Sequence, residues 1–302
     1  MEHIKNTHIY KQTDAYAIEL DAYLPKKTSD HVPVVMHIHG GALISGSREY
    51  ADNTEIAAVT DAGMAYVTVD YRLAPETKLM EISRDIEDAL TWIRGKGAEL
   101  YGFDKNRVAV MGHSAGGYLA LLSGTFPNRP NAIVSFYGYG DITGDWYARP
   151  CPHYLKSPLV SPEEAEGCIT KGIPTGGKMN RTPIYLRARQ TGTWASLVSG
   201  LHPSHVSKAL LPYCPIKNID ALYPPTMLLH GSADTDVPAE QSITMHEELK
   251  KKGIPSQLII IPDGEHGFNA EWGNTSEEYG MVVNFLQKYL TDADVNNAHH
   301  TK

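Results

Sequence analysis

The chain has 302 residues, of which 42% are hydrophobic, enough to bury one large core or two smaller ones. Its formal net charge of −8 argues against a nucleic-acid-binding protein. The sequence contains no run of about 18 apolar residues, so no transmembrane helix is expected. The N-terminus lacks the apolar stretch of a secretory signal, and three cysteines without a CxxC pair predict a reduced, cytoplasmic setting.

The first part of the chain alternates between strands and helices. Residues 8–24 carry apolar side chains near every second position, which predicts one or two strands at an antiparallel edge. Short apolar runs at 32–40 and 64–72 predict further strands, and apolar periodicity predicts helices at 55–63 and 81–94.

The same alternation continues toward the C-terminus. The expected elements are strands at 107–111, 132–138, 226–231 and 256–264, with helices from about 115, near 239–252 and near 276–290. Strands that are almost continuously apolar and alternate with helices predict an α/β fold with a mostly parallel sheet covered on both faces. Ligands bind beyond the carboxyl ends of such strands, so we searched these ends for reactive side chains.

One segment interrupts this alternation. Residues 140–223 are rich in proline and glycine and contain only short helical pieces such as 194–201. The segment is too long for a simple loop. We therefore predict an inserted cap at 140–223, and a core formed by residues 1–139 and 224–302.

A serine lies where a buried strand is expected to meet a helix. Gly112 to Gly116 match G-x-S-x-G, the nucleophile elbow, in which a sharp turn projects the serine hydroxyl above the sheet. The flanking glycines let the strand and helix pass without Cβ clashes. An ordinary strand–helix turn is the alternative, but the strand before Ser114 and the helix after it favour a nucleophile.

A serine nucleophile needs a base and an acid, expected later in the chain in the order Asp, then His. Asp234 follows the strand at 226–231, and His266 follows the strand at 256–264. Asp234 would fix the tautomer of His266 and stabilise its imidazolium form. Asp236, two residues further on, is the alternative acid.

Acyl transfer also needs hydrogen-bond donors for the tetrahedral oxyanion. The consecutive glycines in "HIHGGALISGS" (37–47) allow backbone N–H groups to turn toward one point. We predict an oxyanion hole formed by the N–H groups of Gly41, Ala42 and Ala115. By contrast His37, inside a predicted strand, is expected to be a hydrogen-bonded core histidine.

Together these motifs resemble the α/β-hydrolase superfamily and, within it, the hormone-sensitive-lipase-like esterases. The pieces that carry the resemblance are residues 39–42 (HGGA), 70–76 (DYRLAPE), 112–117 (GHSAGG), 230–238 (HGSADTDVP) and 264–268 (GEHGF). The resemblance implies an eight-stranded sheet, a cap, and cofactor-free hydrolysis of carboxylic esters with short or medium acyl chains. Ala42 and Leu43 depart from it, since that family often has glycine and tryptophan there.

The sequence therefore predicts a serine hydrolase that acts on a small-molecule ester through an acyl-enzyme. A lactonase, amidase or peptidase with the same triad stays open, because the machinery is shared. A non-catalytic receptor on this fold is a further alternative. No metal site is expected, because the spacing of Cys151, Cys168 and Cys214 matches no usual zinc pattern. Neither the acyl chain length nor the oligomeric state can be read from the sequence.

The predicted cap differs in charge from the rest of the chain. It holds nine Lys and Arg against six Asp and Glu, although the whole chain is acidic. One hypothesis is that a cap arginine recognises an anionic substrate. The candidates are Arg149, Arg181, Arg187 and Arg189. Alternatively, these arginines are solvated or pair with the acidic core.

Overall fold

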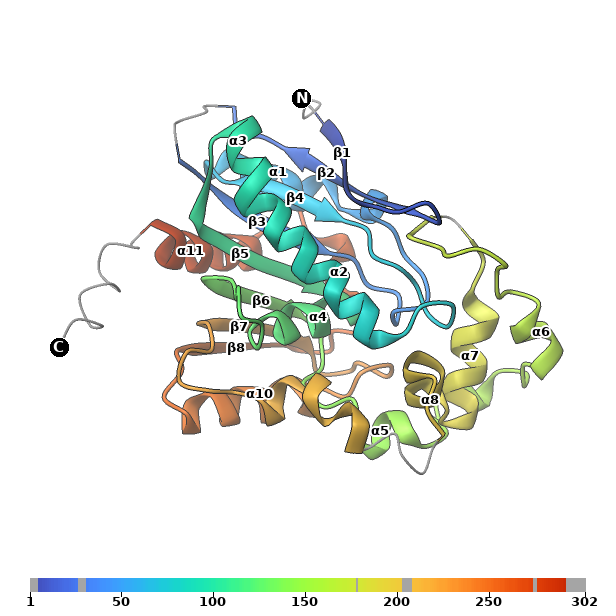
Figure 1. Cartoon of the computed structure of the whole chain (residues 1–302). Coiled ribbons are helices and arrows are strands. Elements are labelled where there is room, and N and C mark those ends of the chain that lie inside the picture. Colours follow the sequence, from blue (N-terminus) through green and yellow to red (C-terminus); the bar gives the residue numbers. More distant parts are fainter. Residues whose placement is uncertain (1–4, 27–30, 178, 203–207, 274–275, 292–302) are drawn as a thin grey trace.

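The computed structural model (Figure 1) describes residues 5–26, 31–177, 179–202, 208–273 and 276–291. Its centre is one eight-stranded sheet with the strand order β1-β2-β4-β3-β5-β6-β7-β8. The strands are β1 (Lys5–Gln12), β2 (Ala17–Tyr23), β3 (Val32–Ile38), β4 (Ala65–Val69), β5 (Phe103–His113), β6 (Ala132–Phe136), β7 (Thr226–Gly231) and β8 (Ser256–Ile261).

The strand pairing confirms the predicted mostly parallel sheet. β1 and β2 form the expected antiparallel edge, and β2 joins β4 in antiparallel pairing. All pairs from β4 to β8 are parallel, with Met36 of β3 opposite Val67 of β4 and Val110 of β5. This common direction brings the carboxyl ends of β3, β5, β7 and β8 to one edge, where the predicted site residues follow them.

Helices cover both faces of the sheet (Figure 1). Those of the core are α1 (Asn53–Asp61), α2 (Leu79–Trp92), α3 (Ala98–Tyr101), α4 (Ala115–Ser123), α10 (Glu240–Lys251) and α11 (Glu277–Thr291). α1 and α11 contribute to one hydrophobic cluster, and α2, α4 and α10 to the other. Every residue of β3, β4, β6 and β7 is buried, which explains their unbroken apolar sequences.

Two boundaries differ most from the sequence prediction. β5 begins at Phe103, because the polar residues 104–106 still belong to the strand, although they lie outside the apolar run at 107–111. The predicted helix at 81–94 extends through a π-helical segment, Ile93–Gly97, into α3. Gly102 ends it in the left-handed conformation, with φ 67°.

Residues 140–223 leave the sheet after β6 and return at β7. Their described part holds α5 (Asp145–Ala148), α6 (Pro162–Glu166), α7 (Thr182–Thr191) and α8 (Trp194–Ser199), which lie together beyond one end of the sheet (Figure 1). Arg181 joins this segment to the core through a buried ion pair with Glu76, with an Nη1–Oε1 distance of 2.9 Å. That the segment acts as a cap over a substrate stays a prediction.

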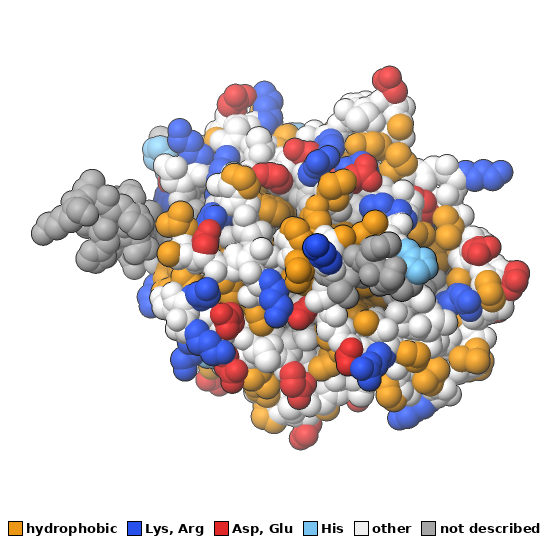
Figure 2. Space-filling model, turned by 60° about the horizontal axis from the view of Figure 1, so that its bottom comes forward, with side chains coloured by type: hydrophobic (Ala, Val, Ile, Leu, Met, Phe, Trp, Pro, Cys, Tyr) orange, Lys and Arg blue, Asp and Glu red, His pale blue; other side chains and the backbone are white. Residues whose placement is uncertain are grey.

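The surface gives little further indication of a partner. On the face in Figure 2, acidic and basic side chains are interspersed with hydrophobic ones, so charge of one sign is not concentrated there. Within the described ranges, no helix is both long and apolar enough to cross a membrane.

Candidate active site

Ser114 lies on a sharp turn between β5 and α4. Its backbone has φ 54° and ψ −117°, a conformation that non-glycine residues rarely adopt. A Cβ at Gly116 would lie 2.0 Å from the carbonyl oxygen of Ile38, and one at Gly112 would lie 2.3 Å from that of Gly116. Only glycine fits at either position, so the sequence G-x-S-x-G and this turn require each other.

The three predicted side chains meet in one hydrogen-bonded chain. His266 Nε2 lies 3.0 Å from Ser114 Oγ, and His266 Nδ1 lies 2.7 Å from Asp234 Oδ2. The other oxygen, Asp234 Oδ1, accepts the backbone N–H groups of Asp236 and Val237, each at 2.9 Å. This is the arrangement that activation of a serine by a base and an orienting acid would require.

The surroundings of Asp234 keep it ionised. Its side chain is fully buried, and burial by itself would favour the neutral form. Hydrogen bonds from His230 and His266 outweigh burial and hold the pKa of Asp234 well below its usual range. The carboxylate is therefore an acceptor for the His266 N–H.

Asp236 occupies a different position. Its Oδ2 lies 3.7 Å from His266 Nε2, the nitrogen that faces the serine, and its Oδ1 accepts a short hydrogen bond from Tyr185 of α7. Arg189 donates to its backbone carbonyl at 2.8 Å. The geometry therefore pairs Asp234 with Nδ1 of the histidine, whereas Asp236 contacts residues of the 140–223 segment.

The glycine-rich turn after β3 lies beside the serine. Gly41 has φ 106° and Ala42 has φ 57°, while Gly41 O accepts the N–H groups of Ile44 and Ser45 at 2.9 Å each. In the described part of the chain, the N–H groups of Gly41 and Ala42 have no hydrogen-bond acceptor. Ala115 is the first residue of α4, so its N–H has no acceptor within the helix.

Three contacts hold this turn in place. His39 stacks on Tyr71 with ring centroids 4.3 Å apart, and the Tyr71 hydroxyl donates to His39 O at 3.1 Å. Trp194 of α8 donates from its indole N–H to Ala42 O at 2.9 Å. The 140–223 segment therefore contacts the predicted oxyanion donors directly.

A cavity of about 510 Å³ opens over these groups. Ser114, His266, Gly41 and Ala42 line it, and so does Tyr185 of the 140–223 segment. Three carboxyl groups also line it, those of Asp52, Glu55 and Asp236, whereas its described lining contains no lysine or arginine. The cavity is thus acidic, although the segment next to it is basic.

The four arginines of the anionic-substrate hypothesis lie outside this lining. Arg181 pairs with Glu76, and Arg187 donates to Val160 O at 2.9 Å. Arg149 forms an exposed pair with Asp145, whereas Arg189 is buried among aromatic rings, 4.8 Å from the Tyr147 centroid. For Arg181 and Arg189 the structure supports the alternative, namely pairing with acidic groups or packing.

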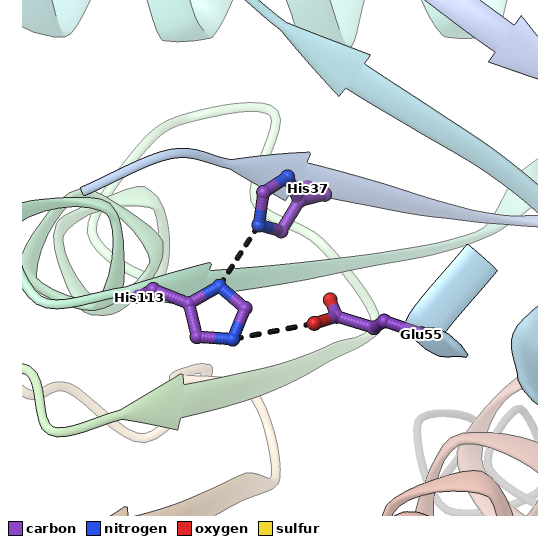
Figure 3. A group of neighbouring side chains, drawn as sticks. All are labelled: His37, Glu55 and His113. Atoms are coloured by element: carbon purple, nitrogen blue, oxygen red, sulfur yellow. Dashed lines mark hydrogen bonds and ion pairs between the residues drawn. The ribbon is translucent and has the colours of Figure 1, made fainter. Parts of the chain in front are cut away.

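Below the cavity lies a buried polar group that the sequence analysis did not connect with the site. His37 of β3, His113 of β5 and Glu55 of α1 lie side by side (Figure 3). His37 is the hydrogen-bonded core histidine that was predicted, with Thr68 Oγ1 at 3.2 Å and His113 Nδ1 at 2.9 Å. Glu55 lies 3.3 Å from the other nitrogen of His113, Nε2.

Two histidines and a carboxylate could in principle ligate a metal ion, and one ligand atom of each lies within 4.8 Å of the others. Figure 3 shows, however, that His37 and Glu55 face different nitrogens of the His113 ring. A metal ion binds one lone pair of an imidazole, so one ion cannot replace both contacts of His113 without rearrangement. The arrangement is a relay of neighbouring side chains, with a hydrogen bond between His37 and His113.

Tyr137 lies beside His266, and Asn269 lies beside His113. The Tyr137 ring packs edge-on to His266 with centroids 4.7 Å apart, and its hydroxyl donates to Asn269 Oδ1 at 2.8 Å. Neither has a motif that would identify it. Glu55 did have a signal, because it lies four residues before Val59, on the face of α1 that is buried.

A serine on a strained elbow, followed by an acid and a histidine at later strand ends of this sheet, defines the class of α/β hydrolases. The comparisons agree. The BD-FAE family model matches residues 20–156, and the model of the prolyl oligopeptidase family matches residues 189–293. The chain belongs to the α/β-hydrolase superfamily.

Solved structures share the whole fold. An alpha/beta hydrolase superfamily protein from Enterococcus faecalis superimposes with a TM-score of 0.74 at 23% identity, covering 95% of this chain and 100% of that one. The esterase LipW from Mycobacterium marinum gives a TM-score of 0.68 at 21% identity, covering 95% and 82%. The implied eight-stranded sheet is therefore confirmed, and the narrower likeness to hormone-sensitive-lipase-like esterases rests on the sequence motifs.

A curated relative is much longer than this chain. The non-reducing polyketide synthase ausA of Emericella nidulans is 29% identical over 346 aligned residues, covering 95% of this chain but 14% of that protein. The chain thus matches a small part of a large synthase.

Proposed function

We propose that the protein is a serine hydrolase that cleaves small carboxylic esters with short or medium acyl chains. The observation that carries the proposal is the hydrogen-bonded chain from Asp234 through His266 to Ser114, at the wall of an open cavity. In this proposal Ser114 is the nucleophile, His266 the base and Asp234 the acid that orients it. The esterases among the solved structures of this fold support the proposed reaction.

The proposed reaction has two steps. Ser114 Oγ attacks the ester carbonyl while His266 Nε2 takes its proton, and the N–H groups of Gly41, Ala42 and Ala115 bind the oxyanion. The histidine then protonates the leaving alcohol, which leaves an acyl-enzyme. In the second step His266 activates water, which releases the acid and restores the serine.

We infer that the part of the substrate within the cavity is uncharged. Its described lining carries the carboxyl groups of Asp52 and Asp236 and no lysine or arginine, so a carboxylate there would be repelled. This inference runs against the hypothesis of an anionic substrate held by a cap arginine. Ser114 and the oxyanion donors act on any acyl group, so chain length is decided by the cavity walls.

A peptidase is the second candidate, and one observation favours it. Asp234 and His266 both lie within residues 189–293, the segment matched by the prolyl oligopeptidase family model. The amide and ester reactions use the same attack and the same oxyanion. The two therefore differ only in which leaving group the site accepts.

The test compares substrates and a nucleophile variant. Wild type is expected to hydrolyse p-nitrophenyl acetate or butyrate faster than octanoate or a peptide p-nitroanilide, and to bind a fluorophosphonate covalently. Ser114→Ala should lose about 10⁶-fold in kcat and all labelling, as for a removed serine nucleophile. Faster cleavage of the anilide would favour the peptidase. No labelling and no turnover would favour a binding protein.

A further inference from the structure

We propose that Glu55 acts as a neutral carboxylic acid that donates to His113 and thereby positions the nucleophile turn at Ser114. This role rests on the proposed function, because it concerns the same turn. Glu55 is a positioning residue and not a catalytic one, since it acts through His113. Three observations support this role: the tautomer of His113, the surroundings of Glu55, and the position of the relay (His37, His113 and Glu55) between the serine turn and the oxyanion turn.

The hydrogen bonds around His113 fix its tautomer. Tyr137 donates to Asn269 Oδ1, so the Asn269 amide nitrogen faces His113 Nε2, at 3.1 Å, as a donor. His113 Nε2 is therefore an acceptor, and the ring proton lies on Nδ1, where it is donated to His37 Nε2. His37 in turn donates from Nδ1 to Thr68 Oγ1. One consistent direction of donation runs along the relay.

This tautomer requires a proton on Glu55. Its Oε1 accepts from the Tyr66 hydroxyl at 3.0 Å, and its Oε2 lies 3.3 Å from His113 Nε2. An ionised Oε2 would face the lone pair of that nitrogen and repel it, whereas a carboxylic acid would share that lone pair with the Asn269 amide as a second donor. Oε2 is buried and forms no hydrogen bond in this structure, so His113 Nε2 is the acceptor that a proton on Oε2 would face.

No cation compensates a charge at this position. Glu55 is 1% exposed, and no lysine or arginine of the described chain forms an ion pair with it. The titratable groups that face it are Tyr66 on β4, His37 on β3, His113 on β5, Tyr137 after β6, Tyr279 on α11, and Asp52 beside the start of α1. Burial, with a smaller contribution from Asp52, raises the pKa of Glu55 to about 8.

The relay connects two parts of the proposed machinery. His113 is bonded through the chain to Ser114, and His37 lies two residues before His39, which shapes the oxyanion turn. His37 is buried and the His113 side chain is 14% exposed, and burial lowers the pKa of His113 to about 4 and that of His37 well below its usual range. Ionised Glu55 would therefore find no proton on Nε2 to accept. It would push His113 away and disturb the serine turn.

The experiment is a pH–rate profile of ester hydrolysis for wild type, Glu55→Gln, Glu55→Leu and Glu49→Gln. Glutamine keeps an N–H donor toward His113 but does not ionise, and leucine keeps neither. Glu49 is an exposed carboxyl nearby that does not line the cavity over Ser114. We expect kcat/KM of wild type and Glu49→Gln to fall above about pH 8, and that of Glu55→Gln to stay level. Glu55→Leu should lose about tenfold in kcat at all pH values.

Stability gives a readout that does not need catalysis. The pKa of Glu55 is higher in the folded chain than in the unfolded chain. The unfolded chain releases this proton near pH 4.5, whereas the folded chain keeps it up to about pH 8. The unfolding free energy of wild type should therefore decline relative to that of Glu55→Gln between pH 5 and pH 8 in urea titrations.

The outcomes separate the two proposals. An alkaline fall in rate shared by wild type and Glu55→Gln, or an equal pH dependence of their stability, would overturn the role of Glu55. Absence of ester hydrolysis together with the expected stability difference would overturn the proposed function but leave Glu55 a neutral acid. Equal rate losses in the glutamine and leucine variants would also contradict donation to His113.

Discussion

Asp234 and Asp236 are two residues apart and face different nitrogens of His266. The sequence left both as candidates for the orienting acid, because either follows the same strand end. The distance of 2.7 Å from Asp234 to Nδ1 favours the first. Since hydrogen bonds from two histidines lower the pKa of Asp234 well below its usual range, its carboxylate stays ionised beside His266 Nδ1.

Replacing each acid by its amide tests this difference. Asp234→Asn should lower kcat by about 10⁴-fold, because the amide stabilises the wrong tautomer of the base. Asp236→Asn is the matched control, and it should cost about tenfold or less, since it removes a charge near Nε2 but keeps an oxygen that can accept from Tyr185. Steady-state kinetics with p-nitrophenyl butyrate measure both. A larger loss in the Asp236 variant would reverse the assignment.

At the scale of elements, the site depends on how closely β5 and α4 pass β3. The backbone of Gly116 is in contact with that of Ile38, with no room for a side chain. The elbow therefore holds the nucleophile strand and the strand that leads into the oxyanion turn at a fixed separation. A methyl group added at Gly116 should therefore displace both the nucleophile strand and the strand that leads into the oxyanion turn.

Gly116→Ala is expected to destabilise the fold by about 1–3 kcal/mol, the usual cost of overpacking a buried position. Gly95→Ala is the control, because a Cβ there meets nothing within 4 Å. It should leave the unfolding free energy unchanged or raise it, since alanine is the better helix former. Urea titrations measure both variants. Equal stability of the two would show that the elbow can open to admit a side chain.

Much of this architecture could be predicted from the sequence, because hydrophobic periodicity and the residues that follow strand ends are local signals. The alternation at 8–24 and the later apolar runs predicted the strands, and the order of elements predicted a parallel sheet with Ser114, Asp234 and His266 at one edge. The strand order, the π-helical segment at Ile93–Gly97 and the full length of β5 could not be predicted. They depend on pairing and packing between distant parts of the chain.

The same limit applies to the site. Asn269 and Tyr185 have no distinctive spacing, and they reach the site only through tertiary packing. One hypothesis from the sequence was that the segment that carries Tyr185 offers an arginine to the substrate, because its net charge is positive. Net charge does not say which side chains face a cavity, and Arg181 instead ties the segment to Glu76.

At the scale of the whole molecule, the 140–223 segment reaches the oxyanion turn through an aromatic stack. Tyr147 lies between Trp146 and Trp194, with ring centroids 4.0 Å and 3.9 Å away. Only Trp194 continues to the oxyanion turn, where its indole N–H donates to Ala42 O. Trp146 donates to Asp141 O, within the segment itself. The two tryptophans thus share a packing role and differ in one hydrogen bond.

This difference makes the pair a test of whether the segment helps to shape the oxyanion turn. Trp194→Phe should lower kcat for p-nitrophenyl butyrate about fivefold, because the loss of one hydrogen bond, worth about 1 kcal/mol, frees the turn that presents Ala42 N–H. Trp146→Phe should lower the melting temperature and leave kcat within about twofold, because its lost bond lies away from the turn. Equal kcat losses would mean that packing alone transmits the effect, and unchanged kcat in both would separate the segment from the chemistry.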